Sequence, residues 1–263
     1  MNQTSVWLDV ATSHVHSGLE CARYRTLALG SWRIVMVAVE QFSGNDTPWE
    51  AFNERELARA EGMPVNKRRH EWLAGRYAAK VALRSWQTFD RVDELSAITI
   101  ENSNRACNKG QPVASIKEAY VSISHSWDVA VAVVSAAPVG VDVEKLRAFS
   151  PAAEDMAFTA SEKGRDSIIS PGGERRWLTL AWCFKEAFMK AHGRGVFGWF
   201  HDLELQRIDQ EGRLTWKSSP RLHRQLGRAM GLAGYGVAVD GYGVVVVGTP
   251  ISPLTVGLAG GAR

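Results

Sequence analysis

The sequence predicts an α+β protein that consists of two subdomains of similar size. Two strongly helical segments, residues 66–86 and 177–193, are each followed by stretches that are expected to form strands. Helices and strands that are grouped along a chain, rather than strictly alternating, are typical of the α+β class. A chain of 263 residues can bury one large core or two smaller ones, and the repeated order of a helix followed by strands favours two.

Residues 32–149 are expected to form the first subdomain. They begin with a strand at residues 32–40, where apolar and polar side chains alternate, and Asn53 is a candidate N-cap for the helix that follows it. Beyond the first strong helix and a loop, residues 119–144 are expected to form two or three strands. Residues 1–31 show no sustained periodicity and are interpreted as an N-terminal extension.

Residues 150–250 are expected to form the second subdomain. Its strong helix places Phe184 and Phe188 on one face, and the segments beyond it have the composition of strands. The glycine-rich residues 251–263 are interpreted as a flexible tail. The sequence contains no obvious repeat and no low-complexity tract.

Composition and charge exclude several classes of protein. The net charge of +3 is too small to indicate nucleic-acid binding. Cys21, Cys107 and Cys183 are scattered without CxxC spacing, which argues against a disulfide framework and against a zinc site. No segment approaches the roughly 20 apolar residues that cross a bilayer, and the start of the chain lacks the pattern of a signal peptide. We expect a soluble, cytoplasmic protein that binds neither nucleic acid nor membranes.

Two carboxylates interrupt an apolar stretch that should be a buried strand, VGVDVEKL at residues 139–146. Asp142 and Glu144 are two residues apart and therefore point to the same face of the strand. A solvated strand face is the ordinary interpretation, because charged side chains are usually exposed. A magnesium site is the alternative, since Mg²⁺ prefers carboxylate oxygens together with water and phosphate. The D-x-E pattern alone leaves both open.

The second strong helix carries Glu186 and Lys190, which are four residues apart and lie on one helix face. They can form an ordinary surface ion pair. Alternatively, they supply a third carboxylate and an ammonium to a site for magnesium-bound pyrophosphate, where Lys190 would neutralise charge on a leaving group.

The strand and helix motifs together resemble the signature of the 4'-phosphopantetheinyl transferases, in particular their larger, surfactin-synthetase-activating type. The resemblance rests on GVDVE followed about forty residues later by WCFKEAFMKAHGRG. Further similar motifs occur in the expected order, namely KRRHEWLAGR, KGQPV, VSISHS and FTASE. The similarity covers roughly residues 32–249, and several motifs in order are more specific than any one of them.

The resemblance implies a reaction and its participants. The 4'-phosphopantetheine arm of coenzyme A would be transferred to a serine of an apo acyl or peptidyl carrier protein, releasing 3',5'-ADP, with Mg²⁺ or Mn²⁺ as cofactor. Asp142, Glu144 and Glu186 would hold the metal. The catalytic residues implied are Asp142, Glu186 and Lys190.

The resemblance also implies a set of contacts to coenzyme A. These are Arg68, Arg76, Lys109, Ser124, His125, Lys185 and Lys190. Without it, Arg68 and Arg76 would be interpreted as a solvated basic face, and Ser124 and His125 as structural residues. Where many relatives have Gly-Lys-Pro, this sequence has Gly110-Gln111-Pro112, so Lys109 stands one position early.

The larger members of this family are pseudo-dimers within one chain, so the resemblance implies a monomer with its site between two halves. An acidic carrier protein would suit the mildly basic chain. It could dock on the apolar residues after the second helix, which could equally be subdomain core: Val196, Phe197, Trp199 and Phe200. Two other functions stay open, a noncatalytic coenzyme A or nucleotide-binding module and a magnesium-dependent phosphohydrolase.

Overall fold

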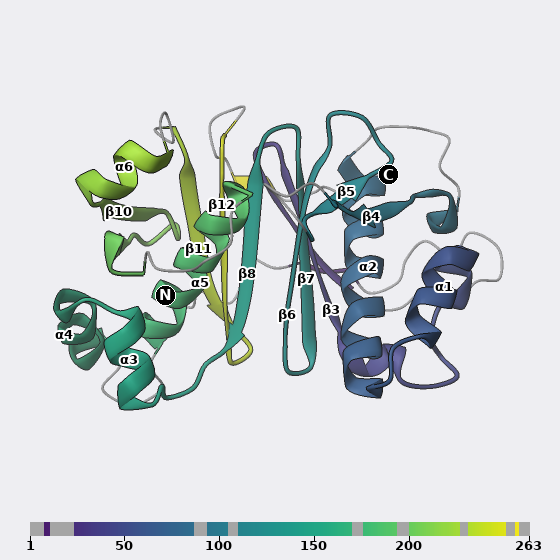
Figure 1. The fold of residues 1–263 in the computed structure, drawn as a ribbon, viewed down its shortest axis with the longest axis horizontal. Coiled ribbons are helices and arrows are strands. Elements are labelled where there is room, and N and C mark those ends of the chain that lie inside the picture. The colour runs from purple at the N-terminus through teal and green to yellow at the C-terminus, as the bar shows by residue number, and fades with distance from the viewer. Residues whose placement is uncertain are drawn as a thin grey trace. The chain divides into compact units, whose positions relative to one another are not determined.

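The computed structural model describes residues 8–10, 24–86, 94–104, 110–169, 176–193, 200–226, 231–250 and 256–257. The chain folds as two compact units, and the second comprises Pro138–Pro250. The division into compact units falls between Ala137 and Pro138, whereas the sequence analysis placed a subdomain boundary at residues 149 and 150, which stays a prediction. The predicted α+β class is confirmed by the mixture of helices and mainly antiparallel strands (Figure 1). Within the described residues, no helix is long and apolar enough to span a bilayer.

The first unit contains an eight-stranded antiparallel sheet. Its main path runs in the order β1-β2-β3-β7-β6-β5-β4, and β13 also pairs with β2. Parts of the predicted extension and of the predicted flexible tail therefore belong to this sheet, because their backbone groups pair with β2. The strands are β1 (Leu8–Val10), β2 (Tyr24–Leu29), β3 (Trp32–Ala38), β4 (Ile100–Asn102), β5 (Pro112–Ala114), β6 (Tyr120–Ser126), β7 (Val129–Ser135) and β13 (Val256–Gly257).

This unit contains two helices, α1 (Glu54–Glu61), which contacts α2, and α2 (Asn66–Trp86), which packs on the sheet. The predicted N-cap Asn53 is confirmed, and Asn53 forms a capping box with Glu56. Helix α2 lies along the sheet (Figure 1) and contacts β3, β6 and β7. It approaches closely at Gly75, where a Cβ atom would lie only 2.8 Å from Ile123 Cγ2.

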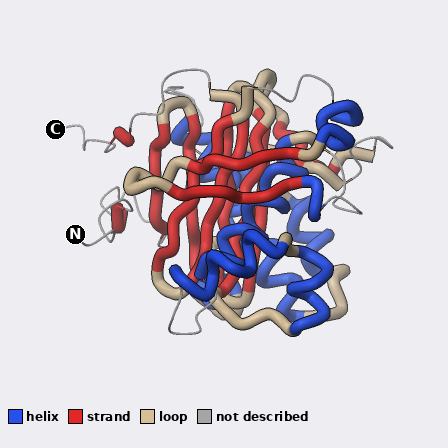
Figure 2. Tube along the Cα trace, turned by 90° about the vertical axis from the view of Figure 1, so that its left-hand side faces the viewer, coloured by secondary structure: helices blue, strands red, loops and turns tan. Residues whose placement is uncertain are grey.

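The second unit contains two sheets, β11-β12-β8 and β10-β9. Helix α5 packs against β8 and β12, and Figure 2 shows the helices and strands in a view turned by 90° from that of Figure 1. The elements are β8 (Val139–Lys145), α3 (Pro151–Ala157), α4 (Ala160–Ile169), α5 (Arg176–Ala191), β9 (Leu203–Ile208), β10 (Leu214–Ser218), α6 (Pro220–Leu226), β11 (Ala233–Val239) and β12 (Tyr242–Gly248).

The two units share a strand topology. In the first, β3 pairs with β7, and β7 forms a hairpin with β6. In the second, β8 pairs with β12, and β12 forms a hairpin with β11. Along the chain, α1 and α2 lie between β3 and β6, and α3 to α6 lie between β8 and β11. The prediction of two similar α+β subdomains is therefore consistent with both units, whereas their mutual arrangement stays a prediction.

A buried lysine occupies the same local setting in each unit. Lys80 donates to Ala51 O at 2.8 Å and to Glu56, and Lys185 donates to Ala157 O at 2.7 Å and to Glu162 at 2.8 Å. Both glutamates also bond to the N-cap residue of their helix.

The matching sequences are FNERE at residues 52–56 and FTASE at residues 158–162. Each lysine lies over the phenylalanine of its segment, with Nζ 5.6 Å from the Phe52 ring and 5.4 Å from the Phe158 ring. This is an internal repeat that is not obvious in the sequence. Within the two segments only the phenylalanine and the glutamate recur, and the lysine follows the glutamate by 24 residues in the first unit but by 23 in the second.

We expect Lys185→Met to lower the free energy of unfolding by about 3–5 kcal/mol, because it strands the buried Glu162 carboxylate. Adding Glu162→Gln should recover part of this loss, since an amide costs less to bury than a charge. Urea denaturation measures both. Lys163→Met is the matched control, because Lys163 pairs with Asp155 at the surface and should cost less than about 1 kcal/mol. Equal losses in the single and double variants would contradict the ion-pair explanation.

Candidate functional site

The carboxylates of β8 lie on a strand that is paired along its whole length with β12. Asp142 stands opposite Val245, and Glu144 stands opposite Gly243. Asp142 is only 5% exposed, and Glu144 is half-buried. A solvated strand face therefore does not describe Asp142, whose buried charge requires a compensating partner.

Helix α5 lies very close to β8 at Gly140. A Cβ atom on Gly140 would be 2.0 Å from Ala187 O and 2.6 Å from Ala191 N. Both distances are far below van der Waals contact, so glycine is required at this position for steric reasons. The close approach brings the α5 residues Glu186 and Lys190 to the carboxylates of the strand.

Lys190 joins the helix to the strand. Its Nζ atom donates to Asp142 Oδ1 at 2.7 Å and to Val141 O at 3.1 Å. The lysine side chain is 30% exposed, whereas that of Asp142 is 6% exposed. The ammonium group thus compensates the buried carboxylate while part of the lysine side chain remains in contact with solvent.

Glu186 lies in a negative environment. Burial, together with the charges of Asp142 and Glu144, raises the pKa of Glu186 to about 7, while Lys190 acts in the opposite direction. Near neutral pH this carboxyl is therefore poised between its two protonation states. A group in that condition can accept a proton from a substrate.

The chemistry of the three carboxylates fits a hard divalent cation, which prefers oxygen ligands and would relieve the repulsion that raises the Glu186 pKa. Within the described part of the chain, however, no group of three or more acidic, histidine or cysteine side chains is arranged to hold a metal. The metal set Asp142, Glu144 and Glu186 accordingly stays a prediction. In this region Asp142 is in contact with the ammonium group of Lys190.

Lys185 requires a correction. It was expected to contact coenzyme A, but it is 1% exposed, and its ammonium group donates to Ala157 O, Glu162 and Phe200 O at 2.7–2.8 Å. Three acceptors saturate the three N–H donors. Lys185 is therefore a structural residue of the second unit.

The apolar residues after α5 are only partly described. Val196, Phe197 and Trp199 lie outside the described residues. Phe200 is half-buried, and its ring stacks on Trp182 with centroids 5.1 Å apart. For Phe200, this packing favours subdomain core over a docking surface.

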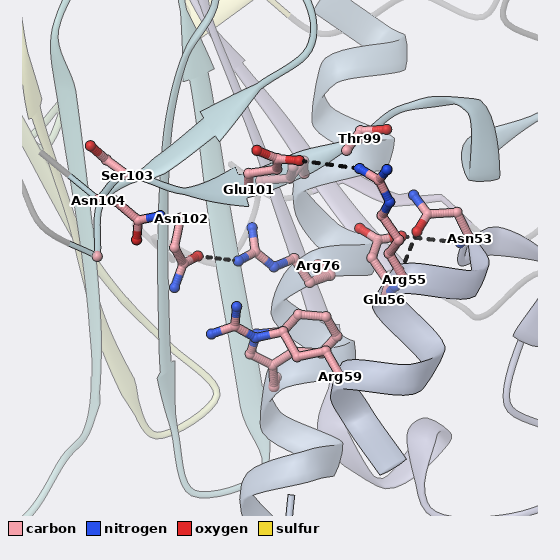
Figure 3. A pocket seen from close by; sticks show the side chains of 13 residues that line it. Asn53, Arg55, Glu56, Arg59, Arg76, Thr99, Glu101, Asn102, Ser103 and Asn104 are labelled. Carbon is pink, nitrogen blue, oxygen red and sulfur yellow. Dashed lines mark hydrogen bonds and ion pairs between the residues drawn. The ribbon is translucent and has the colours of Figure 1, made fainter. Parts of the chain in front are cut away.

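The first unit contains a pocket of about 560 Å³ between α1, α2 and β4 (Figure 3). Arg76 lies against it and is 4% exposed. Its Nη2 atom donates to Asn102, and Nη1 is buried without a hydrogen-bond partner in the described part of the chain. Burial lowers the pKa of Arg76 to about 10, and Glu56 partly offsets this effect. The guanidinium is still charged at neutral pH, with a donor available to an anion.

Two more arginines line this pocket. The guanidinium groups of Arg59 and Arg76 lie 5.8 Å and 5.1 Å from the centroid of the Trp72 ring, and Arg55 forms an exposed ion pair with Glu101 at 3.9 Å. Figure 3 shows these side chains around the pocket. The sequence analysis missed Arg55, Arg59, Trp72 and Asn102. The i,i+4 spacing of the two arginines on α1 was the available signal.

The other predicted nucleotide contacts do not line this pocket. Arg68 is exposed on α2 and is absent from the described residues that form the wall. His125 is exposed on β6, with Nδ1 3.7 Å from Glu71 Oε2, and Ser124 is 8% exposed. Lys109 lies outside the described residues. Among the expected contacts that the structure describes, only Arg76 reaches the pocket.

Comparison with known proteins extends these observations. Residues 138–232, nearly all of the second unit, match the model of the 4'-phosphopantetheinyl transferase superfamily. The chain is 38% identical over 172 residues to enterobactin synthase component D of Escherichia coli O157:H7, covering 60% of this chain and 68% of that protein. It is 34% identical over 109 residues to 4'-phosphopantetheinyl transferase psf-1 of Bacillus pumilus, covering 40% of this chain and 46% of that relative.

Solved structures with partial similarity include a holo-(acyl-carrier-protein) synthase from Bacillus anthracis in complex with coenzyme A (3',5'-ADP). It is 27% identical, with a TM-score of 0.33, and covers 41% of this chain and 94% of that one. An apo-ACPS structure from Chronobacterium ammoiniagenes is 21% identical, with a TM-score of 0.32, and covers 41% of this chain and 92% of that one.

We expect Gly140→Ala to push α5 away from β8 and so to separate Lys190 from Asp142. Overpacking of this kind costs about 1–3 kcal/mol of stability, which thermal unfolding measures. Gly164→Ala is the matched control, because a Cβ there meets nothing within 4 Å and removes a glycine from helix α4. A Gly140→Ala variant as stable as the unmodified protein would contradict the steric argument.

Proposed function

Because the chain belongs to the 4'-phosphopantetheinyl transferase superfamily, we propose that it transfers the 4'-phosphopantetheine arm of coenzyme A to a serine of an apo carrier protein. The products are the holo carrier protein and 3',5'-ADP, and the cofactor is Mg²⁺. The observation that carries this proposal is the contact of Lys190 with buried Asp142, beside Glu186, within the residues that match the family model. A cytoplasmic monomer is part of the same proposal.

The reaction is a displacement at phosphorus. The serine Oγ of the carrier attacks the phosphorus that bears the pantetheine arm, and the bond from that phosphorus to the bridging oxygen breaks. The bridging oxygen leaves with 3',5'-ADP, and the serine proton passes to a base. Such transfers depend mainly on positioning and charge neutralisation, which suits a site made of carboxylates and one ammonium group.

Glu186 and Lys190 take complementary roles in this step. Glu186, which lies close to Asp142 and Lys190, accepts the serine proton at a carboxylate oxygen. Lys190 donates hydrogen bonds to a pyrophosphate oxygen and neutralises charge on the leaving group. Magnesium, held by Asp142, Glu144 and Glu186, would supply further positive charge at the pyrophosphate.

The nucleotide end of coenzyme A is assigned to the pocket of the first unit. The Nη1 donor of Arg76, which has no hydrogen-bond partner among the described residues, and the neighbouring Arg59 support binding of the 3'-phosphate there. Arg68, Lys109, Ser124 and His125 remain further proposed contacts on the basis of family resemblance alone.

Mass spectrometry tests the activity directly. The full chain is incubated with coenzyme A, Mg²⁺ and several apo acyl and peptidyl carrier proteins, and a modified carrier should gain about 340 Da from the added arm. Unchanged carriers with intact coenzyme A would favour a binding module. Cleavage of coenzyme A without a gain in carrier mass would favour a phosphohydrolase.

We expect Glu186→Gln to lower the turnover number by about 10²–10⁴-fold, because the amide cannot accept the serine proton. The variant keeps the shape of the side chain, so coenzyme A binding, measured by calorimetry without metal, should be nearly unchanged. Near-normal turnover by Glu186→Gln would show that another group is the base.

We expect Arg76→Ala to reduce the preference for coenzyme A over dephospho-coenzyme A by about ten- to a hundred-fold, because one charge-assisted contact to the 3'-phosphate is lost. The measurement is the ratio of kcat/KM for the two substrates, in which general damage cancels. Arg68→Ala should change this ratio less, since Arg68 does not line the pocket. A larger change in this ratio for Arg68→Ala than for Arg76→Ala would indicate that Arg68 binds the 3'-phosphate.

A further inference from the structure

We infer that Lys190 serves as the resident cation of the carboxylate cluster in the ligand-free protein and must leave Asp142 before a divalent cation can bind there. This inference rests on the proposed function, because it concerns the same residues. It adds an order of events to that function, in which coenzyme A draws Lys190 away and thereby opens the metal position.

The contacts of Lys190 are those of a bound cation. Its Nζ atom is 2.7 Å from Asp142 Oδ1 and 3.1 Å from Val141 O, so a carboxylate oxygen and a backbone oxygen of β8 both face it. Oxygen atoms of these two kinds are also usual ligands of hard metal ions. The ammonium group therefore takes ligand atoms that a divalent cation would use.

Charge explains why the lysine stays there and why a metal cannot simply join it. The Asp142 carboxylate is buried, so leaving it without a counter-charge would be costly. A divalent cation and an ammonium group on the same carboxylate would repel each other at close range. The two cations therefore compete, which agrees with the lack of a ready-made metal group among the described residues.

Lys190 is able to move, because its side chain is 30% exposed and has four rotatable bonds. The pyrophosphate of coenzyme A offers the ammonium group a second anion. When Lys190 transfers to the pyrophosphate, Asp142 loses its counter-charge and becomes a strong metal ligand. Coenzyme A and the divalent cation should therefore bind with positive coupling, and each should raise the affinity for the other.

The test measures Mn²⁺ binding by electron paramagnetic resonance of the free ion, using the full chain freed of coenzyme A. Lys190→Gln and Lys190→Met should bind Mn²⁺ about ten-fold more tightly than the unmodified protein, since even water-like screening gives a close ion pair about this much energy. Added coenzyme A should tighten Mn²⁺ binding more in the unmodified protein than in either variant. Equal or weaker Mn²⁺ binding by folded variants would overturn the inference.

Lys163→Gln is the matched control. Lys163 also lies 2.7 Å from an aspartate, Asp155, and its side chain is 35% exposed, so the substitution removes the same charge from a similar ion pair. It should leave Mn²⁺ affinity unchanged. A rise equal to that of the Lys190 variants would mean that net charge alone is responsible, and the inference would fail.

A second measurement needs no variant. Amine acetylation of the unmodified protein, mapped by mass spectrometry, should label Lys190 faster when saturating Mg²⁺ is present, with Lys163 as the internal reference. Unchanged relative labelling would overturn the inference. Carrier modification is assayed on the same preparation, so a protein that transfers the arm but shows no cation exchange refutes this inference and leaves the proposed function standing.

Discussion

The candidate site depends on the steric constraint at Gly140. Strand β8 carries two carboxylates and helix α5 carries a third together with an ammonium group, and the four can act together only if the backbones lie almost in contact. A Cβ atom at Gly140 would fall 2.0 Å from a carbonyl oxygen of α5. Because Gly140 has no Cβ atom, α5 can lie close enough to β8 for Lys190 to reach Asp142. The electrostatics of the site follow from this packing, including the raised pKa of Glu186.

The repeated motif of a glutamate and a buried lysine has different hydrogen-bond partners in the two units. In the second, Glu162 is saturated, because the N–H of Leu205 on β9 donates to its Oε1 atom while Lys185 and Thr159 donate to the other oxygen. In the first, the equivalent Glu56 also holds its lysine and its N-cap residue, but its Oε1 atom has no hydrogen-bond partner in the described part of the chain. Glu56 borders the pocket that contains Arg76. Strand β9 thus supplies a hydrogen bond to Oε1 of Glu162. The corresponding atom of Glu56 has no hydrogen-bond partner in the described part of the chain, and Glu56 lines a pocket.

The sequence predicted those features that depend on local pattern. Side-chain alternation put Asp142 and Glu144 on one strand face, helix periodicity located α2 and α5, and Asn53 was found as a cap. Contacts between residues that are far apart in the sequence could not be predicted from local patterns. Lys185 belongs to the signature motif, yet its hydrogen-bond partners are Ala157 of α3, Glu162 of α4 and Phe200, so nothing nearby in sequence revealed its burial. Arg59 was missed for the same reason, because Trp72 and Arg76 approach it only in the folded chain.

The pairing of β13 with β2 bears on the order in which the chain can fold as it is synthesised. Val256 and Gly257 cover part of the β2 edge, whereas the second unit is complete at Pro250. A ribosome therefore releases every residue of the second unit before it releases the segment that covers this edge. Until then the backbone groups of Ala28 and Leu29 on that side are open to other strands. A chain that ends before residue 256 would leave this part of the β2 edge unpaired.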